Sequence, residues 1–152
     1  MPHLHDLIDF TVSAYIVHDD TVLLVDHTTL KTWMPVGGHI ELDEDPEEAL
    51  VREVKEESGL DVTIEGARPH LIDPGTKALI APVFMDIHDI TETHRHVGLV
   101  YFARSATQDV VLAEKEHKDI RWFTAEELGD ASFSIRPAVR FYAEEALKKL
   151  GL

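Results

Sequence analysis

One segment of the sequence, residues 37–60, constrains the fold of the chain more than any other. Asp45 occupies the position of a helix N-cap, a proline follows it, and Glu48 falls three residues after it, as in a capping box. Gly59 then suits the left-handed conformation that commonly ends a helix. These local signals predict a helix over 46–58.

The predicted helix concentrates negative charge on one face. Glu53, Glu56 and Glu57 stand at spacings i, i+3 and i+4, so their carboxylates point to the same side. Such like charges repel by roughly 0.2–0.5 kcal/mol per pair, and the chain already carries a formal net charge of −15. An apolar stripe for the core is predicted from Ala49, Leu50, Val51 and Val54.

Two interpretations explain this acidic face. On composition alone, a run of charges is typical of a solvated helix surface. Alternatively, the carboxylates bind hard divalent cations, because Mg²⁺ takes oxygen ligands and usually shares them with water and phosphates. The Gly37-Gly38 turn permits close backbone approach, so the main-chain carbonyl of Gly38 is a further candidate ligand. An anionic protein then binds an anionic phosphate ligand through the cations.

The remaining composition narrows the class of protein. With 152 residues, 44% of them hydrophobic and 28% charged, the chain is expected to form one globular domain over 1–152. The net charge argues against binding to nucleic acid polymers or anionic membranes. The absence of cysteine excludes disulfides, a thiol nucleophile and thiolate metal sites. With neither a secretory signal nor an apolar run of membrane-spanning length, a soluble cytoplasmic protein is expected.

Outside the helix, strand and turn signals alternate along the chain and favour the α/β class with a mixed sheet. No repeat, linker or low-complexity segment interrupts them. A capping pattern at Thr124 and Glu127 predicts a short helix over 124–128, and an amphipathic pattern predicts another over 137–150. Strands are predicted over 8–17, 21–27, 32–38, 61–71, 78–88, 95–105 and 119–124.

The segment 38–60 resembles the signature of the Nudix hydrolase (MutT-like) family. That signature is a glycine, five residues, a glutamate, seven residues, and then Arg-Glu-aliphatic-any-Glu-Glu-any-Gly-aliphatic. It covers about a sixth of the chain, and the order of elements around it is also similar to the family's. The fold that the resemblance implies is an α/β/α sandwich with a mixed β-sheet. Every specified position is matched, by Gly38, Glu44, Arg52, Glu53, Val54, Glu56, Glu57, Gly59 and Leu60.

The resemblance also implies a reaction. Members of the family hydrolyse a nucleoside diphosphate linked to another moiety, with Mg²⁺ or Mn²⁺ as cofactor. Water attacks a phosphorus of the diphosphate, and a phosphate-containing group leaves. ADP-ribose-like molecules and (d)NTPs are both open as substrates. The sequence contains no asparagine, which weakens but does not exclude an oxidised guanine nucleotide, because family members that take it read the purine with an asparagine.

The resemblance assigns roles to the residues of the signature. Glu53, Glu56 and Glu57 are implied to bind the metal, and Glu53 and Glu56 form the catalytic group together with Arg52. Arg52 is implied to orient Glu53, and Glu44 to pair with Arg52 across the loop. Gly59 has a structural role at the end of the helix.

The resemblance leaves open which carboxylate accepts the proton of the attacking water. Different members of the family use a carboxylate of the helix or one in a loop outside the signature. Glu116 is preferred, because several members carry such a glutamate just before the corresponding strand, and Glu92 is the second candidate. The alternative role for Glu116 is that of an exposed loop carboxylate.

Three basic side chains are candidates for substrate binding. His39 directly follows the Gly-Gly turn and can reach phosphates, although a plain loop role is equally open. Arg95 and Arg136 can meet distal phosphates, or lie on the surface without a ligand.

Closely spaced histidines raise the question of a second metal site. His94 and His96 are two residues apart, so on a strand they point to the same side and can ligate a metal. Neither has a partner at a recognised zinc spacing, and surface or substrate-contact roles are the other interpretation. His3 and His5 form a similar pair.

A rival function is a catalytically silent Nudix-like module that binds or senses a nucleotide. Silent members are expected to have lost glutamates of the signature, and none is lost in this sequence. Both functions imply a small nucleotide-type partner. A homodimer is also possible by resemblance to the family.

Overall fold

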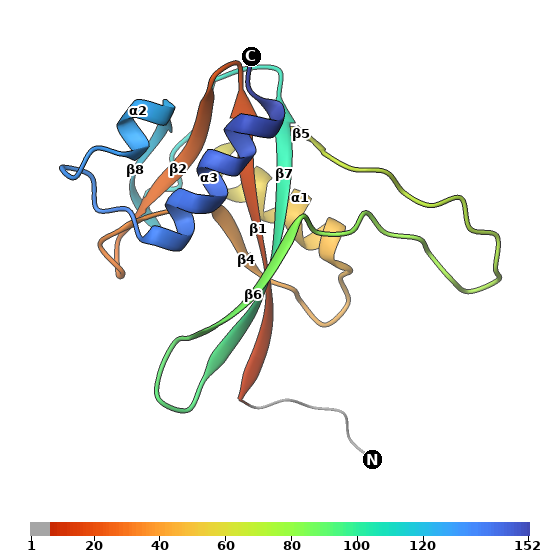
Figure 1. Ribbon diagram of the computed structural model, residues 1–152. Coiled ribbons are helices and arrows are strands. Elements are labelled where there is room, and N and C mark those ends of the chain that lie inside the picture. The colour runs from red at the N-terminus through yellow and green to blue at the C-terminus, as the bar shows by residue number, and fades with distance from the viewer. Residues whose placement is uncertain (1–6) are drawn as a thin grey trace.

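The structure is a computed structural model that describes residues 7–152, so the His3 and His5 pair lies outside the described residues. Figure 1 shows a mixed arrangement of strands and helices. The strands are β1 (Ile8–His18), β2 (Thr21–His27), β3 (Trp33–Met34), β4 (Val36–His39), β5 (Val62–Ile64), β6 (Phe84–Asp89), β7 (Arg95–Ser105) and β8 (His117–Phe123), and the helices are α1 (Pro46–Ser58), α2 (Ala125–Leu128) and α3 (Pro137–Leu150).

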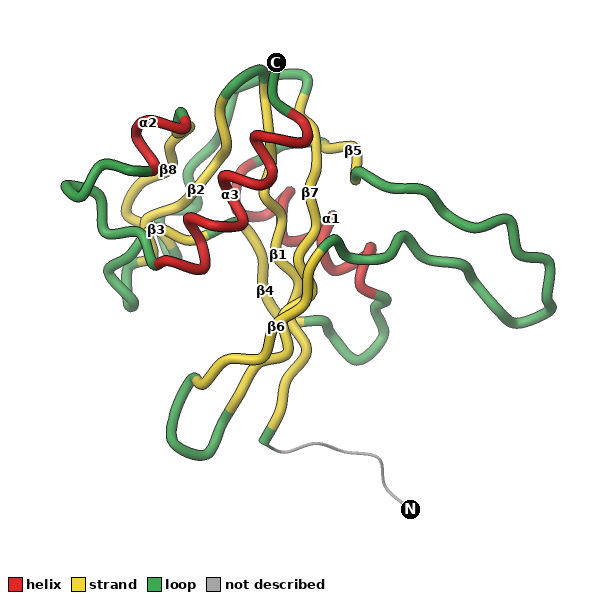
Figure 2. The backbone as a smooth tube through the Cα atoms, in the orientation of Figure 1, coloured by secondary structure: helices red, strands yellow, loops and turns green. Residues whose placement is uncertain are grey.

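The strands form one mixed sheet. β1 and β7 pair in parallel at its centre, from Ile8 opposite Arg95 to Val17 opposite Arg104. The other strand pairs are antiparallel. The strand order is β3-β2-β1-β7-β5, with β4 beside β1, β6 beside β7 and β8 beside β2 (Figure 2). The mixed sheet predicted from the sequence is confirmed.

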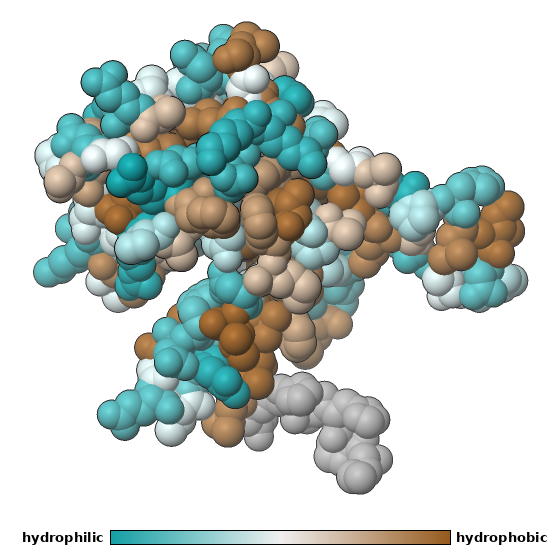
Figure 3. Space-filling view, in the orientation of Figure 1, coloured by the Kyte–Doolittle hydropathy of each residue, from teal (hydrophilic) through white to brown (hydrophobic). Residues whose placement is uncertain are grey.

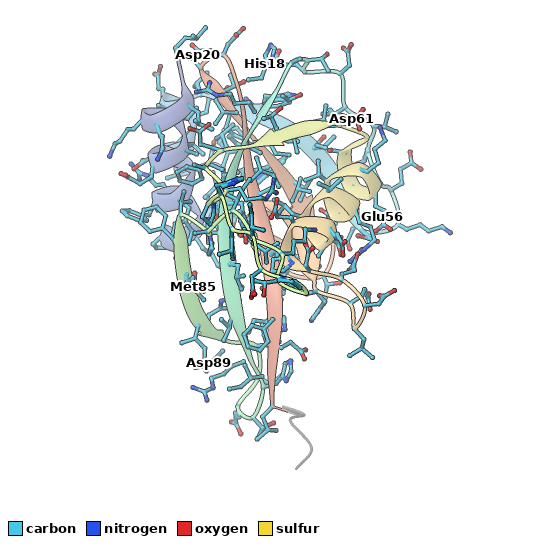
Figure 4. All side chains as sticks on the ribbon, turned by 90° about the vertical axis from the view of Figure 1, so that its right-hand side faces the viewer. His18, Asp20, Glu56, Asp61, Met85 and Asp89 are labelled. Atoms are coloured by element: carbon cyan, nitrogen blue, oxygen red, sulfur yellow. The ribbon has the colours of Figure 1, made fainter. Side chains whose placement is uncertain are left out.

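Helices cover both faces of the sheet, with α1 on one side and α3 on the other (Figure 4). Because successive side chains of a strand point to opposite faces, β1 supplies both cores. Ala14 and Ile16 pack into the core that contains Leu50 of α1, whereas Tyr15 packs into the core that contains Val139 of α3. The α/β/α sandwich is therefore confirmed. No helix among the described residues is long and apolar enough to cross a membrane.

The helix predicted over 46–58 is confirmed with its caps. The Asp45 carboxylate accepts a hydrogen bond from the Glu48 N–H at 2.9 Å, and the Glu48 carboxylate accepts one from the Asp45 N–H at 3.0 Å. Gly59 ends the helix with a φ of 74°, a conformation that glycine adopts without steric cost. These contacts fix where α1 starts and stops, and therefore which residues share its faces.

The segment 65–83 forms a long loop where the sequence predicted parts of two strands. The predictions over 61–71 and 78–88 were too long, because only β5 and β6 at the two outer ends are paired in the sheet. The segment contains three prolines, which cannot donate to a strand ladder. Gly66 and Gly75 also turn the backbone, with φ values of 131° and 82°.

Ion pairs hold this loop against the start of α1. The Arg68 guanidinium pairs with the Glu47 carboxylate, which also accepts a hydrogen bond from the Ile80 N–H at 3.1 Å. Lys77 Nζ lies 2.6 Å from a carboxylate oxygen of Asp45, so the lysine is already paired with the N-cap. The far end of the loop exposes apolar side chains (Figure 3), and the large exposed apolar residues of the loop are Leu71 and Ile72.

Two other predicted strands differ from the structure by a few residues. The strand predicted over 32–38 is divided at Pro35 into β3 and β4, because proline has no N–H for the ladder. The strand predicted over 119–124 begins earlier, at His117, and ends at Phe123. Thr124 is the N-cap of α2, as its capping pattern predicted.

The apolar stripe predicted on α1 contains one error. Ala49, Leu50 and Val54 are buried in the core, but Val51 is 51% exposed. Each residue advances about 100° around a helix, so Val51 is turned away from the sheet when Leu50 faces it. The sheet covers a narrower part of α1 than the sequence pattern suggested.

We expect Leu50→Ala and Val51→Ala to have very different effects on stability. Leu50 is 0% exposed, so its truncation should lower the free energy of unfolding by about 2–5 kcal/mol. Val51→Ala is the matched control on the same helix and should change it by less than about 0.5 kcal/mol. Urea unfolding monitored by circular dichroism measures both, and equal losses would contradict this packing of α1.

Candidate functional site

Arg52 is the centre of a hydrogen-bond network that joins α1 to the loop in front of it. Its Nε and Nη2 donate to the two carboxylate oxygens of Glu44 at 2.7 and 2.9 Å, a two-point contact. Nη2 also donates to the main-chain carbonyl of His39 at 3.1 Å. The hydrogen bonds from Arg52 lower the pKa of Glu44, and those to Glu44 raise the pKa of Arg52. Both side chains are therefore charged over a wide pH range.

The same guanidinium positions two carboxylates of the acidic face. Arg52 Nη1 donates to Glu53 Oε1 at 2.9 Å and to Glu56 Oε2 at 3.3 Å. The Glu53 side chain is only 13% exposed, whereas that of Glu56 is 57% exposed. Figure 4 shows Glu56 on the outer side of α1, away from α3. One carboxylate is therefore held inside the site, and the other lies at its entrance.

Gly38 brings the backbone of β4 against the Glu53 carboxylate. Gly38 pairs with Val12 of β1, whose side chain faces the α1 core. A Cβ at Gly38 would lie 2.6 Å from Glu53 Cδ, closer than real Cβ contacts allow. Only glycine leaves room for the carboxylate here. The absence of a side chain explains why the signature glycine and Glu53 can share one site.

Glu57 is buried and paired with a histidine that the sequence did not suggest. Glu57 is 3% exposed and His117 is 4% exposed. Their Oε2 and Nε2 atoms lie 3.0 Å apart. Among the buried side-chain polar atoms of the described residues, His117 Nδ1 is the one without a hydrogen-bond partner. His117, at the start of β8, therefore holds Glu57 in place.

The two candidate proton acceptors lie in different places. Glu116 precedes β8, and its Oε2 lies 3.9 Å from His117 Nε2. The side-chain ligand atoms of Glu57, Glu116 and His117 all lie within 4.8 Å of one another. Glu92 lies in the hairpin loop between β6 and β7, and no hydrogen bond or ion pair among the described residues joins it to the signature carboxylates. Glu116 therefore lies close to one signature carboxylate, Glu57, and its role as proton acceptor stays a prediction.

The acidic face lacks positive charge at its inner end. Burial and, to a lesser extent, the neighbouring Glu57 carboxylate together raise the pKa of Glu53 to about 7, against the opposing hydrogen bond from Arg52. The Glu53 and Glu57 carboxylates therefore lie close together with little exposure to solvent, and the Arg52 guanidinium is the cation that contacts Glu53. Carboxylate oxygens and a nearby main-chain carbonyl are the donors that Mg²⁺ and Mn²⁺ prefer. The residues present fit a hard divalent cation.

The side chains of the predicted substrate-binding residues form no hydrogen bond or ion pair with the signature carboxylates among the described residues. Arg95 begins β7 and Arg136 precedes α3, and both are exposed. No hydrogen bond or ion pair within residues 7–152 joins either arginine to Glu53 or Glu56. The side chain of His39 approaches Asp9, as described below. Substrate binding by these three residues stays a prediction.

The sequence does not indicate a role for His117, because its contact with α1 is long-range. The residue is 60 positions from Glu57 and reaches it only through the pairing of β2 with β8, which places His117 opposite His27. The single available signal was its position directly after Glu116 at the start of a strand. Such a signal is indistinguishable from that of an ordinary surface histidine.

We expect Glu53→Gln to change how the stability of the metal-free protein depends on pH. The folded-state pKa of Glu53, about 7, lies above the ordinary value of 4.5, so the folded protein binds more protons than the unfolded chain between these values. This group therefore lowers stability as pH rises from about 5 to 7. Relative to wild type, Glu53→Gln should gain about 1–2 kcal/mol between about pH 5 and pH 8, after allowance for solvent screening.

Denaturant unfolding in the presence of a chelator measures this gain. Identical pH dependence in the two proteins would show that Glu53 is not held in a charge-poor environment. Glu126→Gln, at an exposed position of α2, is the control and should follow the wild-type curve.

Comparison with known proteins places this site in a family. The NUDIX domain matches residues 8–143. The CTP pyrophosphohydrolase of Escherichia coli (strain K12) is 30% identical over 97 residues, which are 59% of this chain and 72% of that protein. A Nudix family hydrolase from Clostridium perfringens has a similar structure, with a TM-score of 0.83, 38% identity, and coverage of 93% of this chain and 97% of that one.

A second solved structure supports the fold alone. The MutT Nudix hydrolase of Burkholderia pseudomallei is 22% identical, with a TM-score of 0.68 and coverage of 95% of this chain and 99% of that one. Because the domain match spans most of the chain and includes the whole 38–60 segment, this protein belongs to the Nudix family of pyrophosphohydrolases.

Proposed function

We propose that this protein hydrolyses a diphosphate bond in a nucleoside diphosphate derivative, with Mg²⁺ or Mn²⁺ as cofactor. One observation carries the proposal. Arg52 holds Glu53 beside the bare backbone of Gly38 and also contacts Glu56, while His117 of β8 holds Glu57. Such an arrangement preorganises oxygen ligands around a position that carries too little positive charge.

The proposed role of a metal cofactor rests on the oxygen atoms that are available to bind it. Glu53, Glu56, Glu57 and the Gly38 carbonyl would hold the cation, in keeping with the dependence of the Nudix family on divalent metals. When bound, such a cation neutralises charge on the phosphate oxygens and lowers the pKa of water in its shell. The protein's own contribution is to hold these oxygens in place before the substrate arrives.

Residues around the carboxylates divide the remaining tasks. Arg52 orients Glu53 and is itself oriented by the two-point contact with Glu44. His117 is a positioning residue, because it acts through Glu57. Glu116 accepts the proton of the attacking water in this proposal, since its carboxylate is 61% exposed and adjoins His117. The exposure leaves it free to swing toward a bound substrate.

The name of a relative and a groove beside the site guide the choice of substrates to test. The name of the E. coli relative is that of a CTP pyrophosphohydrolase, which favours nucleoside triphosphates as the first class to test here. ADP-ribose-like molecules are the second class. A groove of about 700 Å³ adjoins Arg52 and Glu56, and Val51 and Ile64 give it an apolar wall. It has room for a group attached to the diphosphate.

We expect Glu56→Gln and Glu57→Gln each to reduce Mg²⁺-dependent turnover by about 100-fold or more, because each removes a negatively charged ligand without changing side-chain size. The measurement is a panel of nucleoside triphosphates and ADP-ribose-like compounds with Mg²⁺ or Mn²⁺, coupled to a phosphatase that releases phosphate. Glu126→Gln is again the matched control and should retain wild-type rates.

Two results would overturn the proposal. Wild-type rates in both glutamine variants would remove the helix carboxylates from the reaction. If wild-type protein binds nucleotides but turns over none of the panel, the function is that of a silent binding module.

A further inference from the structure

A second group of potential metal ligands surrounds the carboxylate of Asp9. The Oδ2 atom of Asp9 lies 2.9 Å from His94 Nε2, 3.3 Å from His39 Nε2 and 3.9 Å from His96 Nε2. Three imidazoles therefore approach one oxygen. They come from the end of β4, the start of β7 and the loop before it, so chain folding assembles them from distant positions.

This group lies on the opposite face of the sheet from the α1 carboxylates. Gly38 faces Glu53, and His39 is the next residue of β4, so its side chain points to the other face. The sheet register places Asp9 directly beside His96 on that face. The Asp9 group is therefore spatially separate from the proposed catalytic centre.

The distances match those of a tetrahedral site. Zinc binds imidazole nitrogen at about 2.0–2.1 Å and carboxylate oxygen at about 2.0–2.2 Å, so two ligand atoms of a tetrahedron lie about 3.3–3.5 Å apart. Asp9 Oδ2 lies at this spacing from His39 Nε2 (3.3 Å), closer to His94 Nε2 (2.9 Å) and farther from His96 Nε2 (3.9 Å). The ligand atoms of Asp9, His94 and His96 all lie within 4.8 Å of one another. Small side-chain rotations suffice to enclose an ion.

Hydrogen bonding alone does not account for the group. The contact between Asp9 and His94 is a hydrogen bond, but no side-chain hydrogen bond is formed by His39 or His96 among the described residues. Imidazole nitrogen is a common metal ligand.

We propose that Asp9, His94 and His96 bind a transition metal ion of the zinc class, with an open coordination position toward His39. Imidazole nitrogen suits Zn²⁺, Cu²⁺ and Ni²⁺, whereas Mg²⁺ prefers oxygen. The ion therefore differs in class from the one proposed at α1. Three protein ligands with one open position would leave the ion accessible to water or to a further ligand. This inference does not depend on the proposed function.

The test is calorimetric titration of Zn²⁺ into the protein in excess Mg²⁺, which occupies the oxygen site. Wild-type protein should bind one equivalent, and Asp9→Asn, His94→Gln and His96→Gln should each weaken binding at least about 10-fold, the lower end of the loss seen for indirect partners of metal ligands. Co²⁺ in place of Zn²⁺ should give the visible absorption bands of tetrahedral coordination in wild type only.

Controls separate this site from other histidines and from the glutamates. His88 lies on the same face with its ring centre 5.7 Å from that of His96, but its imidazole contacts Asp86. His88→Gln should bind Zn²⁺ like wild type. We expect one equivalent of Zn²⁺ to bind also to two double variants, His3→Gln/His5→Gln and Glu56→Gln/Glu57→Gln. Thermal unfolding without metal checks that every variant is folded.

Three outcomes would overturn the proposal. The first is no Zn²⁺ binding in the presence of Mg²⁺. The second is undiminished binding in Asp9→Asn and His96→Gln. The third is an equal loss in His88→Gln, which would indicate a diffuse histidine surface instead of a defined site.

Discussion

The site on α1 depends on one arginine among carboxylates. Arg52 contacts Glu44, Glu53 and Glu56 and also the main chain at His39, so it links the helix, the preceding loop and the end of β4. Without its charge, burying Glu53 near Glu57 would be strongly unfavourable. With it, the site is held together yet remains short of positive charge. That shortage is the physical basis of the proposed cation binding.

The sequence predicted what local interactions determine. The bounds of α1 follow from Asp45, Glu48 and Gly59, which act within a few residues, and the structure has the same bounds. The Gly37-Gly38 turn was expected to permit close backbone approach, and the structure shows that Gly38 lies against the Glu53 carboxylate. Where local signals misled, as over 65–83, prolines and glycines removed the strand pairing that the hydrophobic pattern suggested.

Long-range pairing created what the sequence did not indicate. The contact of His117 with Glu57 requires β8 to pair with β2, and the contact of Asp9 with His96 requires β1 to pair with β7. Neither pairing leaves a trace in spacing along the chain. The pleat of β4 then separates the two groups, since Gly38 and His39 point to opposite faces. One strand thus contributes to an oxygen-rich site on one face and a nitrogen-rich group on the other.

In the proposed function, the acidic face of α1 binds a divalent cation, and Glu53 is partly protonated at neutral pH before the cation binds. Calorimetric titration of Mg²⁺ near pH 7, repeated in buffers with different ionisation enthalpies, measures the protons released on binding. Because the pKa of Glu53 is about 7, binding should release about half a proton per site, falling toward zero at about pH 9. Mg²⁺ binding without proton release, or no binding at all, would contradict this account.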